Sequence, residues 1–195
     1  MTNNKDNTLY ISLDVEAVGT NPISGSMSSF ALVAIDRDET IHGTFERNLK
    51  DREGTVRDPG TMDFWKKNIH SYMEMQKNQV EPADAMRDAK EWLKSFNRPV
   101  VVVAYPAVYD YMWFYSYWMF YNKDFDPIGF SCLDMKTLAM EKLGIIFRQS
   151  AKKVFPKDWF SDKYKHDHTS IQDALEQSIL FCRMINSKKV ENAQS

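Results

Sequence analysis

The chain has 195 residues, of which 43% are hydrophobic and 27% are charged, and its formal net charge is −2. This is the composition of an ordinary globular domain, which excludes a largely disordered chain, and the length suits one domain rather than two. The small negative charge argues against a protein that coats nucleic acid through bulk attraction, but it does not exclude an enzyme that grips one strand end.

The polar ends of the chain set the expected domain limits. Residues 1–7 contain no apolar run after a basic start, which predicts no secretory signal and a disordered N-terminus. Residues 8–186 carry the periodic apolar patterns, so we predict a single domain there. Residues 187–195 are predicted to be a polar, frayed tail.

Two further features bear on location. The most apolar stretch, 100–121, is interrupted by Pro106 and Asp110 and is rich in tyrosine, so we expect no membrane-spanning helix. Cys132 and Cys182 are isolated thiols without metal-ligand spacing. Both are expected to be reduced, which favours a cytoplasmic protein.

Apolar periodicity predicts the secondary structure along the chain. Alternation or Val-rich runs indicate strands, whereas spacings of three and four residues indicate helices. In chain order we expect a strand at 9–13, strands at 30–35 and 40–49 joined by the turn 36–38, a helix at 61–73 capped by Thr61, a helix at 82–96, strands at 99–104 and 130–133 around a helix at 109–121, a helix ending at Gly144 and a final helix at 170–185. This order predicts an α/β fold with a mixed five-stranded sheet flanked by helices.

A pair of acidic residues closes the first predicted strand. Asp14 and Glu16 are separated by one residue, and alternate strand residues point to the same side of a sheet. Carboxylates so close repel one another, and a hard divalent cation would turn that repulsion into ligation. A solvated acidic pair at a strand end is an equally weighted alternative.

Two more acidic signals lie further along the chain. Asp110 follows the Val-rich stretch at 100–103, which would bring it to the C-terminal edge of the sheet, although a helix N-cap explains it locally. His168 precedes the final helix, and Asp173 lies in its first turn. A capping box of Ser170 with Asp173 is the alternative, but such a box normally carries Glu or Gln and leaves His168 unexplained.

A second histidine, His166, forms a His-Asp-His run with His168. We interpret His166 as a surface residue. The run has the look of a zinc-binding pair, but no further residue in the sequence is spaced to complete such a site.

In combination, the three acidic signals resemble the motifs of the DEDDh branch of the DnaQ-like 3′→5′ exonucleases, which have a ribonuclease H-like fold. The resemblance runs from about residue 10 to residue 184, in the same order and with similar separations. The matching residues are Asp14 and Glu16 for the first motif, Tyr109 and Asp110 for the second, and His168 and Asp173 for the third.

Two other segments refine the resemblance. Residues 61–65 and 131–134 are similar to a subgroup of compact bacterial and phage exonucleases that includes the mycobacterial ribonuclease AS. In one place the chain departs from the pattern, because Tyr105 and Pro106 stand where many relatives have His-Asn. This change leaves the acidic residues intact but concerns a position that commonly shapes the substrate pocket.

The resemblance implies hydrolysis that removes nucleoside 5′-monophosphates from the 3′ end of single-stranded nucleic acid, with RNA slightly favoured over DNA. Two Mg²⁺ or Mn²⁺ ions would stabilise the attacking and leaving oxygens together. Asp14 would bridge both ions. Glu16 and Asp173 would complete the site that binds the attacking water, and Asp110 would serve the second ion. His168 would take a proton from that water.

Substrate contacts are predicted from aromatic and basic residues. The stretch 147–165 combines basic residues with Phe155 and Trp159, a pattern typical of single-strand binding through stacking and phosphate attraction. A basic surface loop with core-facing aromatics is the alternative. The predicted substrate contacts are Ala17, Trp65, Tyr109, Lys152 and Lys153. For Trp65, packing in the core is an alternative of at least equal weight.

The aromatic helix at 109–121 is interpreted mainly as core, with a homodimer surface as a hypothesis that a monomeric mass at micromolar concentration would exclude.

Three rival functions follow from the same residues. A non-cutting binding module would be favoured by a missing carboxylate, and none is missing. A ribonuclease H-type or transposase-type endonuclease does not call for His168. A structural oligomer leaves the acidic set as a coincidence.

Overall fold

The computed structural model describes residues 7–189, in which five strands form one sheet in the order β3-β2-β1-β4-β5. Antiparallel pairs join β1 to β2 and β2 to β3, whereas β4 and β5 continue parallel to β1. The strands are β1 (Leu9–Ala17), β2 (Met27–Ile35), β3 (Ile41–Asn48), β4 (Val100–Ala104) and β5 (Cys132–Asp134). The mixed five-stranded sheet of a ribonuclease H-like fold is therefore confirmed.

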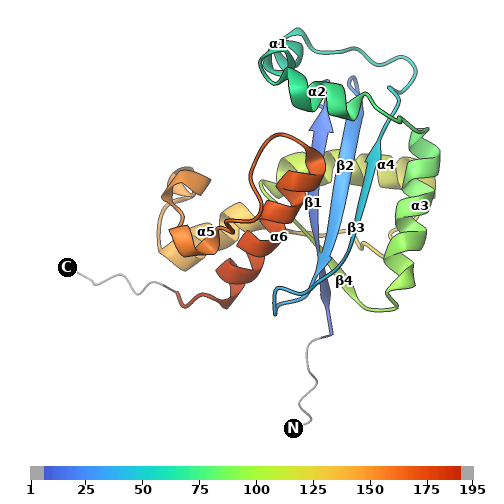
Figure 1. Cartoon of the computed structure of the whole chain (residues 1–195). Coiled ribbons are helices and arrows are strands. Elements are labelled where there is room, and N and C mark those ends of the chain that lie inside the picture. The colour runs from blue at the N-terminus through green and yellow to red at the C-terminus, as the bar shows by residue number, and fades with distance from the viewer. Residues whose placement is uncertain (1–6, 190–195) are drawn as a thin grey trace.

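Helices cover both faces of the sheet and one of its ends. Figure 1 shows α5 and α6 against one face, α3 and α4 on the other, and α1 and α2 across the end at which β1 finishes. The helices are α1 (Pro59–Lys67), α2 (Ile69–Met75), α3 (Pro82–Ser95), α4 (Ala107–Asn122), α5 (Met135–Leu143) and α6 (Ser170–Asn186). No helix within residues 7–189 is both long enough and apolar enough to cross a membrane.

The central strand β1 presents different side chains to its two faces. Ile11 and Leu13 pack into the cluster formed with α3 and α4, and Tyr10 packs into the cluster formed with α5 and α6. Because side chains alternate along a strand, Asp14 and Glu16 share the face of Tyr10. The sheet thus directs both carboxylates toward α6.

Four of the nine aromatic residues of α4 are buried in the core. Trp113, Phe114, Tyr117 and Trp118 are each at most 1% exposed, whereas Phe120 is 64% exposed. The core interpretation of the aromatic helix is therefore confirmed for these four residues. The hypothesis that this helix also forms a homodimer surface is not tested by the structure of one chain.

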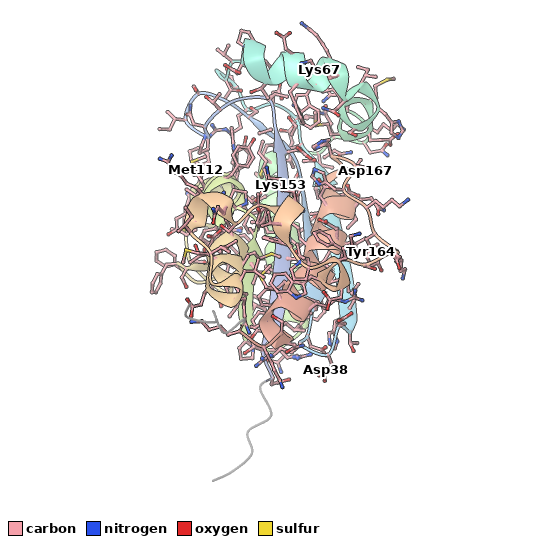
Figure 2. All side chains as sticks on the ribbon, turned by 90° about the vertical axis from the view of Figure 1, so that its left-hand side faces the viewer. Asp38, Lys67, Met112, Lys153, Tyr164 and Asp167 are labelled. Carbon is pink, nitrogen blue, oxygen red and sulfur yellow. The ribbon has the colours of Figure 1, made fainter. Side chains whose placement is uncertain are left out.

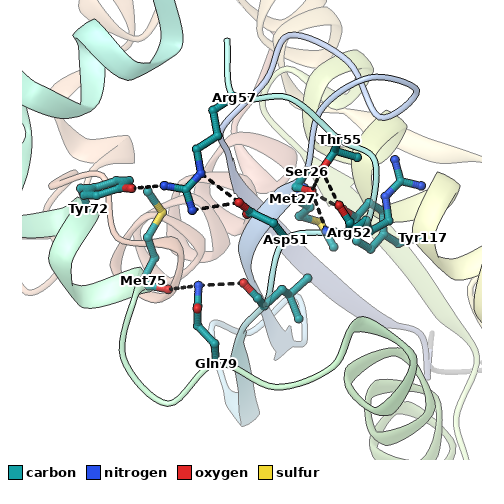
Figure 3. Close-up of polar contacts among 11 residues, drawn as sticks. Ser26, Met27, Asp51, Arg52, Thr55, Arg57, Tyr72, Met75, Gln79 and Tyr117 are labelled. Atoms are coloured by element: carbon teal, nitrogen blue, oxygen red, sulfur yellow. Dashed lines mark hydrogen bonds and ion pairs between the residues drawn. The ribbon is translucent and has the colours of Figure 1, made fainter. Parts of the chain in front are cut away.

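The connection from β3 to α1 ties the end helices to the sheet (Figure 3). Arg57 lies 2.8 Å from Asp51 and donates a hydrogen bond of 2.6 Å to the hydroxyl of Tyr72 on α2. Thr55 and Ser26 hydroxyls are 2.7 Å apart, which joins the same connection to the residue before β2. These contacts hold α1 and α2 in place above the sheet end.

Several predicted element limits were wrong. The helix expected at 61–73 is two helices, because Asp58 rather than Thr61 is the N-cap of α1 and Asn68 interrupts the helical geometry. Thr169 rather than Ser170 precedes α6 as its N-cap residue. Of the predicted disordered N-terminus, residues 1–7, only Asn7 is described by the structure. Of the predicted tail, residues 187–195, only residues 187–189 are described.

Candidate active site

Four carboxylates from three elements converge at the sheet end beneath α1 and α2. Oxygens of Asp14 and Glu16 on β1 and of Asp173 in the first turn of α6 lie within 4.8 Å of one another. Asp110, in the first turn of α4, reaches β1 from the other side, where its Oδ1 accepts a hydrogen bond of 3.3 Å from the Val15 amide. The structure therefore brings together all four acidic residues singled out in the sequence.

Burial and mutual repulsion dominate the electrostatics of this cluster. Burial raises the pKa of Asp14 well above its usual range, and the charges of Asp110 and Glu16 raise it further. The pKa of Glu16 is raised by burial and by the charge of Asp173. Burial likewise raises the pKa of Asp110. Three buried carboxylates and the partly buried Glu16, if ionised at neutral pH, call for a compensating positive charge.

The donor set fits divalent cations that prefer oxygen. Asp110 Oδ2 is buried and has no hydrogen-bond partner among the described residues, so it is available as a ligand. One oxygen of Asp14, Oδ1, accepts a hydrogen bond of 2.7 Å from Gln177, which orients that carboxylate. An all-carboxylate cluster suits Mg²⁺ or Mn²⁺ better than zinc.

Gln177 is a site residue that the sequence analysis missed. It lies one helical turn after Asp173 on α6 and is 2% exposed. The signal was present in the sequence, because a residue four positions after Asp173 lies on the same helix face. A buried amide that donates to a metal-ligating carboxylate is a typical orienting partner.

His168 lies at the edge of the carboxylate cluster on a constrained loop. Its backbone has a φ of 61°, in the left-handed region, and its ring packs edge-on against Phe64 of α1 with centroids 5.0 Å apart. Burial lowers the pKa of His168 from 6.5, and the neighbouring His166 lowers it further. A neutral imidazole at neutral pH is the form that can accept a proton.

His166 is exposed, as the surface interpretation expects, but it also contacts the carboxylate cluster. Although its side chain is 47% exposed, Nδ1 lies 2.6 Å from Asp173 Oδ2, and the ring centroids of His166 and His168 are 4.4 Å apart. The hydrogen bond with Asp173 raises the pKa of His166. Sequence spacing could not show this contact, because the loop folds back over the first turn of α6.

The predicted substrate contact at Trp65 is wrong, because this side chain belongs to the core. Trp65 is 2% exposed, packs with Val18 and Met75, and donates an indole hydrogen bond of 2.8 Å to the carbonyl of Ala17. Ala17, which is 1% exposed, therefore presents its carbonyl to Trp65 rather than to solvent. The exposed aromatic residue of this segment is Phe64, next to His168.

The basic stretch after α5 contributes one cation to the site. Lys152 Nζ lies 2.5 Å from the buried carboxylate of Glu176, and its charge lowers the pKa of both Asp14 and Asp110. Lys153 is exposed. Figure 2 shows Lys153 at the same level as Asp167, just below the helices at the sheet end.

Two aromatic residues of the same stretch do not face the solvent. Phe155 and Trp159 are 6% and 5% exposed and pack into the core cluster under α5 and α6, so the prediction that they stack on bases is wrong.

Tyr109 of α4 is 37% exposed beside the carboxylate cluster, where burial and the charge of Glu16 raise its pKa to about 12. Its hydroxyl therefore remains a hydrogen-bond donor at neutral pH.

A pocket opens beside the carboxylates between α2 and the start of α6. Its lining includes Glu16, Ser71 and His168. The Ser71 hydroxyl donates to the Asp167 carbonyl at 2.7 Å, which fixes the His168 loop to α2. Glu16 and His168 both line this pocket, so solvent water can reach them.

Comparisons with known proteins identify the fold. No protein-family model matches the sequence, and no curated protein matches it. Among solved structures, the nuclease domain of 3′hExo, a DEDDh family member bound to rAMP, has a TM-score of 0.70 at 11% identity, covering 95% of this chain and 94% of that chain. S. pombe Pop2p in its Mg²⁺- and Mn²⁺-bound form has a TM-score of 0.63 at 15% identity, with coverages of 90% and 82%.

A third structural neighbour is part of a longer protein. E. coli Exonuclease I, in complex with a dT13 oligonucleotide, has a TM-score of 0.62 at 13% identity and covers 93% of this chain but only 41% of its own length. Identities this low establish a shared fold and nothing finer. The chain therefore has the ribonuclease H-like fold found in these exonuclease structures.

Proposed function

We propose that this chain is a metal-dependent 3′→5′ exonuclease that hydrolyses single-stranded nucleic acid, with RNA slightly favoured over DNA. The observation that carries the proposal is the convergence of Asp14, Glu16, Asp110 and Asp173 from three separate elements, with His168 beside them. The DEDDh motifs of the sequence and the fold of the 3′hExo nuclease domain support it. Membership of the compact bacterial and phage subgroup is part of the proposal.

The proposed chemistry assigns each group one task. Asp14, Glu16, Asp110 and Asp173 would hold two Mg²⁺ or Mn²⁺ ions, which supply positive charge to the phosphoryl oxygens. His168 would accept a proton from the water that attacks the last phosphodiester bond. Lys152, paired with Glu176 at the cluster edge, would attract the phosphate backbone, and exposed Lys153 would do so further out.

Two rival functions meet specific obstacles in the structure. A binding module without catalysis would have no use for a cluster of carboxylates in which burial and mutual repulsion raise the pKa values of Asp14, Glu16 and Asp110. A ribonuclease H-type endonuclease would not require an imidazole next to the cluster, whereas His168 is held there by Phe64. The exonuclease proposal uses both features.

The test compares 5′-labelled RNA and DNA strands of equal sequence, incubated with Mg²⁺ or Mn²⁺ and either wild type or Asp14→Asn. The proposal predicts a ladder that shortens from the 3′ end with wild type and no ladder with the variant. An internally labelled circular strand, which has no end, is the control. Cleavage of the circle would identify an endonuclease. If no strand is cleaved, the rival function of a binding module without catalysis is favoured.

Loss of the Gln177 amide is expected to weaken metal binding rather than the fold. In Gln177→Ala, Asp14 loses its 2.7 Å hydrogen bond, and removal of such orienting partners costs about 10–100-fold in metal affinity or activity. The measurement is the Mg²⁺ concentration that gives half-maximal hydrolysis. Gln172→Ala, on the same helix but partly exposed, is the matched control. An unchanged Mg²⁺ requirement in Gln177→Ala would contradict the orienting role.

A further inference from the structure

The His-Asp-His run acquires in the fold the third ligand that the sequence lacks. Imidazole nitrogens of His166 and His168 and a carboxylate oxygen of Asp173 lie within 4.8 Å of one another. This group differs in chemistry from the neighbouring cluster of Asp14, Glu16 and Asp173, because two of its three donors are nitrogen. The two groups share Asp173.

We propose that His166, His168 and Asp173 form a transition-metal site, suited to Zn²⁺, that competes with the magnesium cluster for Asp173. Two imidazoles and one carboxylate are ligands that zinc takes, and a water would complete four-fold coordination. Imidazole favours zinc over magnesium, whereas an all-carboxylate cluster favours magnesium. The adjacent groups thus select different ions.

Little movement separates the observed pair of His166 and Asp173 from a liganded one. His166 Nδ1 and Asp173 Oδ2 are 2.6 Å apart, a hydrogen-bonded distance. Two ligands at about 2.0–2.1 Å from a tetrahedral zinc ion stand about 3.3–3.4 Å apart, so the ion replaces the shared proton after the pair opens by less than about 1 Å. His166 is half exposed, which leaves its ring free to make this shift.

Asp167 builds the loop that presents both imidazoles. Its backbone amide donates to Asp173 Oδ1 at 3.0 Å, and its carboxylate accepts from the Thr169 amide at 3.0 Å and the Thr169 hydroxyl at 2.6 Å. The second oxygen of Asp173 is left to face His166. The ligands are therefore held close before any ion arrives, which reduces the ordering cost of binding.

Occupation of this site would inhibit hydrolysis, and this consequence rests on the proposed function. An ion held by His168 removes the lone pair that the general base needs. An ion held by Asp173 also takes one ligand away from Asp14 and Glu16. Zinc bound at the histidines therefore blocks proton transfer and weakens the magnesium cluster at once.

The binding test uses the full chain without nucleic acid or magnesium, so it is independent of nuclease activity. Zn²⁺ is titrated by calorimetry, and Co²⁺ is added as a probe whose visible absorption reports tetrahedral coordination. His166→Gln is expected to weaken Zn²⁺ binding by at least about tenfold, since even the loss of an outer partner costs about 10–100-fold. His168→Asn, which suits the left-handed backbone at this position, is expected to do the same.

Two control variants decide where the ion lies. His70→Gln, which removes an exposed imidazole of α2, should bind Zn²⁺ as wild type does. Glu16→Gln, which alters only the carboxylate cluster, should keep the tetrahedral Co²⁺ spectrum. If Glu16→Gln loses the spectrum while His166→Gln keeps it, the ion belongs to the carboxylate cluster and the proposal is overturned.

The inhibition test follows hydrolysis at fixed Mg²⁺ with increasing Zn²⁺. The zinc concentration that halves the rate should rise at least about tenfold in His166→Gln relative to wild type and His70→Gln. Each rate is normalised to the same variant without zinc. Equal zinc sensitivity in all three would refute the regulatory site, whereas a protein that binds zinc but never cuts would refute the proposed function alone.

Discussion

Asp14→Asn is expected to lower the rate of hydrolysis by at least about 10²–10³-fold, and at the same time to stabilise the metal-free fold. Removal of a single transition-state donor costs about 10²–10³-fold, and Asp14 stands at the centre of the acidic cluster. The amide keeps an oxygen at the place of Oδ1, so the hydrogen bond from Gln177 can persist. The loss of activity would therefore come from the missing charge.

The stability gain has its origin in the same cluster. Burial and the charges of Asp110, Glu16 and Asp173 raise the pKa of Asp14, so the ionised carboxylate is less stable in the folded chain than in the unfolded chain. A neutral amide removes this repulsion. Each kcal/mol gained would raise the unfolding temperature by about 2–4 °C for a domain of this size.

Thermal unfolding with and without Mg²⁺ measures both effects on one sample. Wild type should gain stability from Mg²⁺, because the ion binds only the folded state, and Asp14→Asn should gain much less. Asp38→Asn, in the exposed turn after β2, is the matched control. A variant that cuts at the wild-type rate, or that unfolds earlier without metal, would contradict this account of the cluster.

The sequence predicts the sheet well because its strands carry strong local patterns. The Val-rich run of β4 and the alternating start of β1 leave few alternatives, and both strands lie in the predicted sheet. The ends of helices were less predictable where capping residues decided them. Asp58 begins α1 earlier than Thr61 would, since Pro59 suits the first helical position and the Asp58 carboxylate accepts from the Thr61 amide.

The acidic half of the site was predictable because each carboxylate sits at the end of a recognisable element. Partners that depend on how a loop folds back were not. Nothing in the local pattern around His166 shows that its ring contacts Asp173, which lies in the first turn of the following helix. The burial of Trp65 also depends on a distant partner, because its indole N–H donates a hydrogen bond to the Ala17 carbonyl, 48 positions away in the sequence.

His168 is expected to carry the proton transfer, so its replacement should lower the rate by about 10²–10⁴-fold. The choice of variant matters because His168 has a φ of 61°, where alanine would be strained and asparagine is tolerated. His168→Asn therefore removes the imidazole with little disturbance of the loop that holds Asp173. Metal binding to the carboxylate cluster, measured by calorimetry with Mg²⁺, should be retained.

The pH dependence of hydrolysis separates a general base from a structural residue. A base works only when unprotonated, so the wild-type rate should fall as the pH drops through the pKa of His168. Burial lowers that pKa from 6.5, which places the fall on the acid side of that value. In His168→Asn the residual rate should lack this limb, while His70→Gln should keep it. A limb that survives in His168→Asn would show that protonation of another group, such as the carboxylates of the cluster with their raised pKa values, sets it.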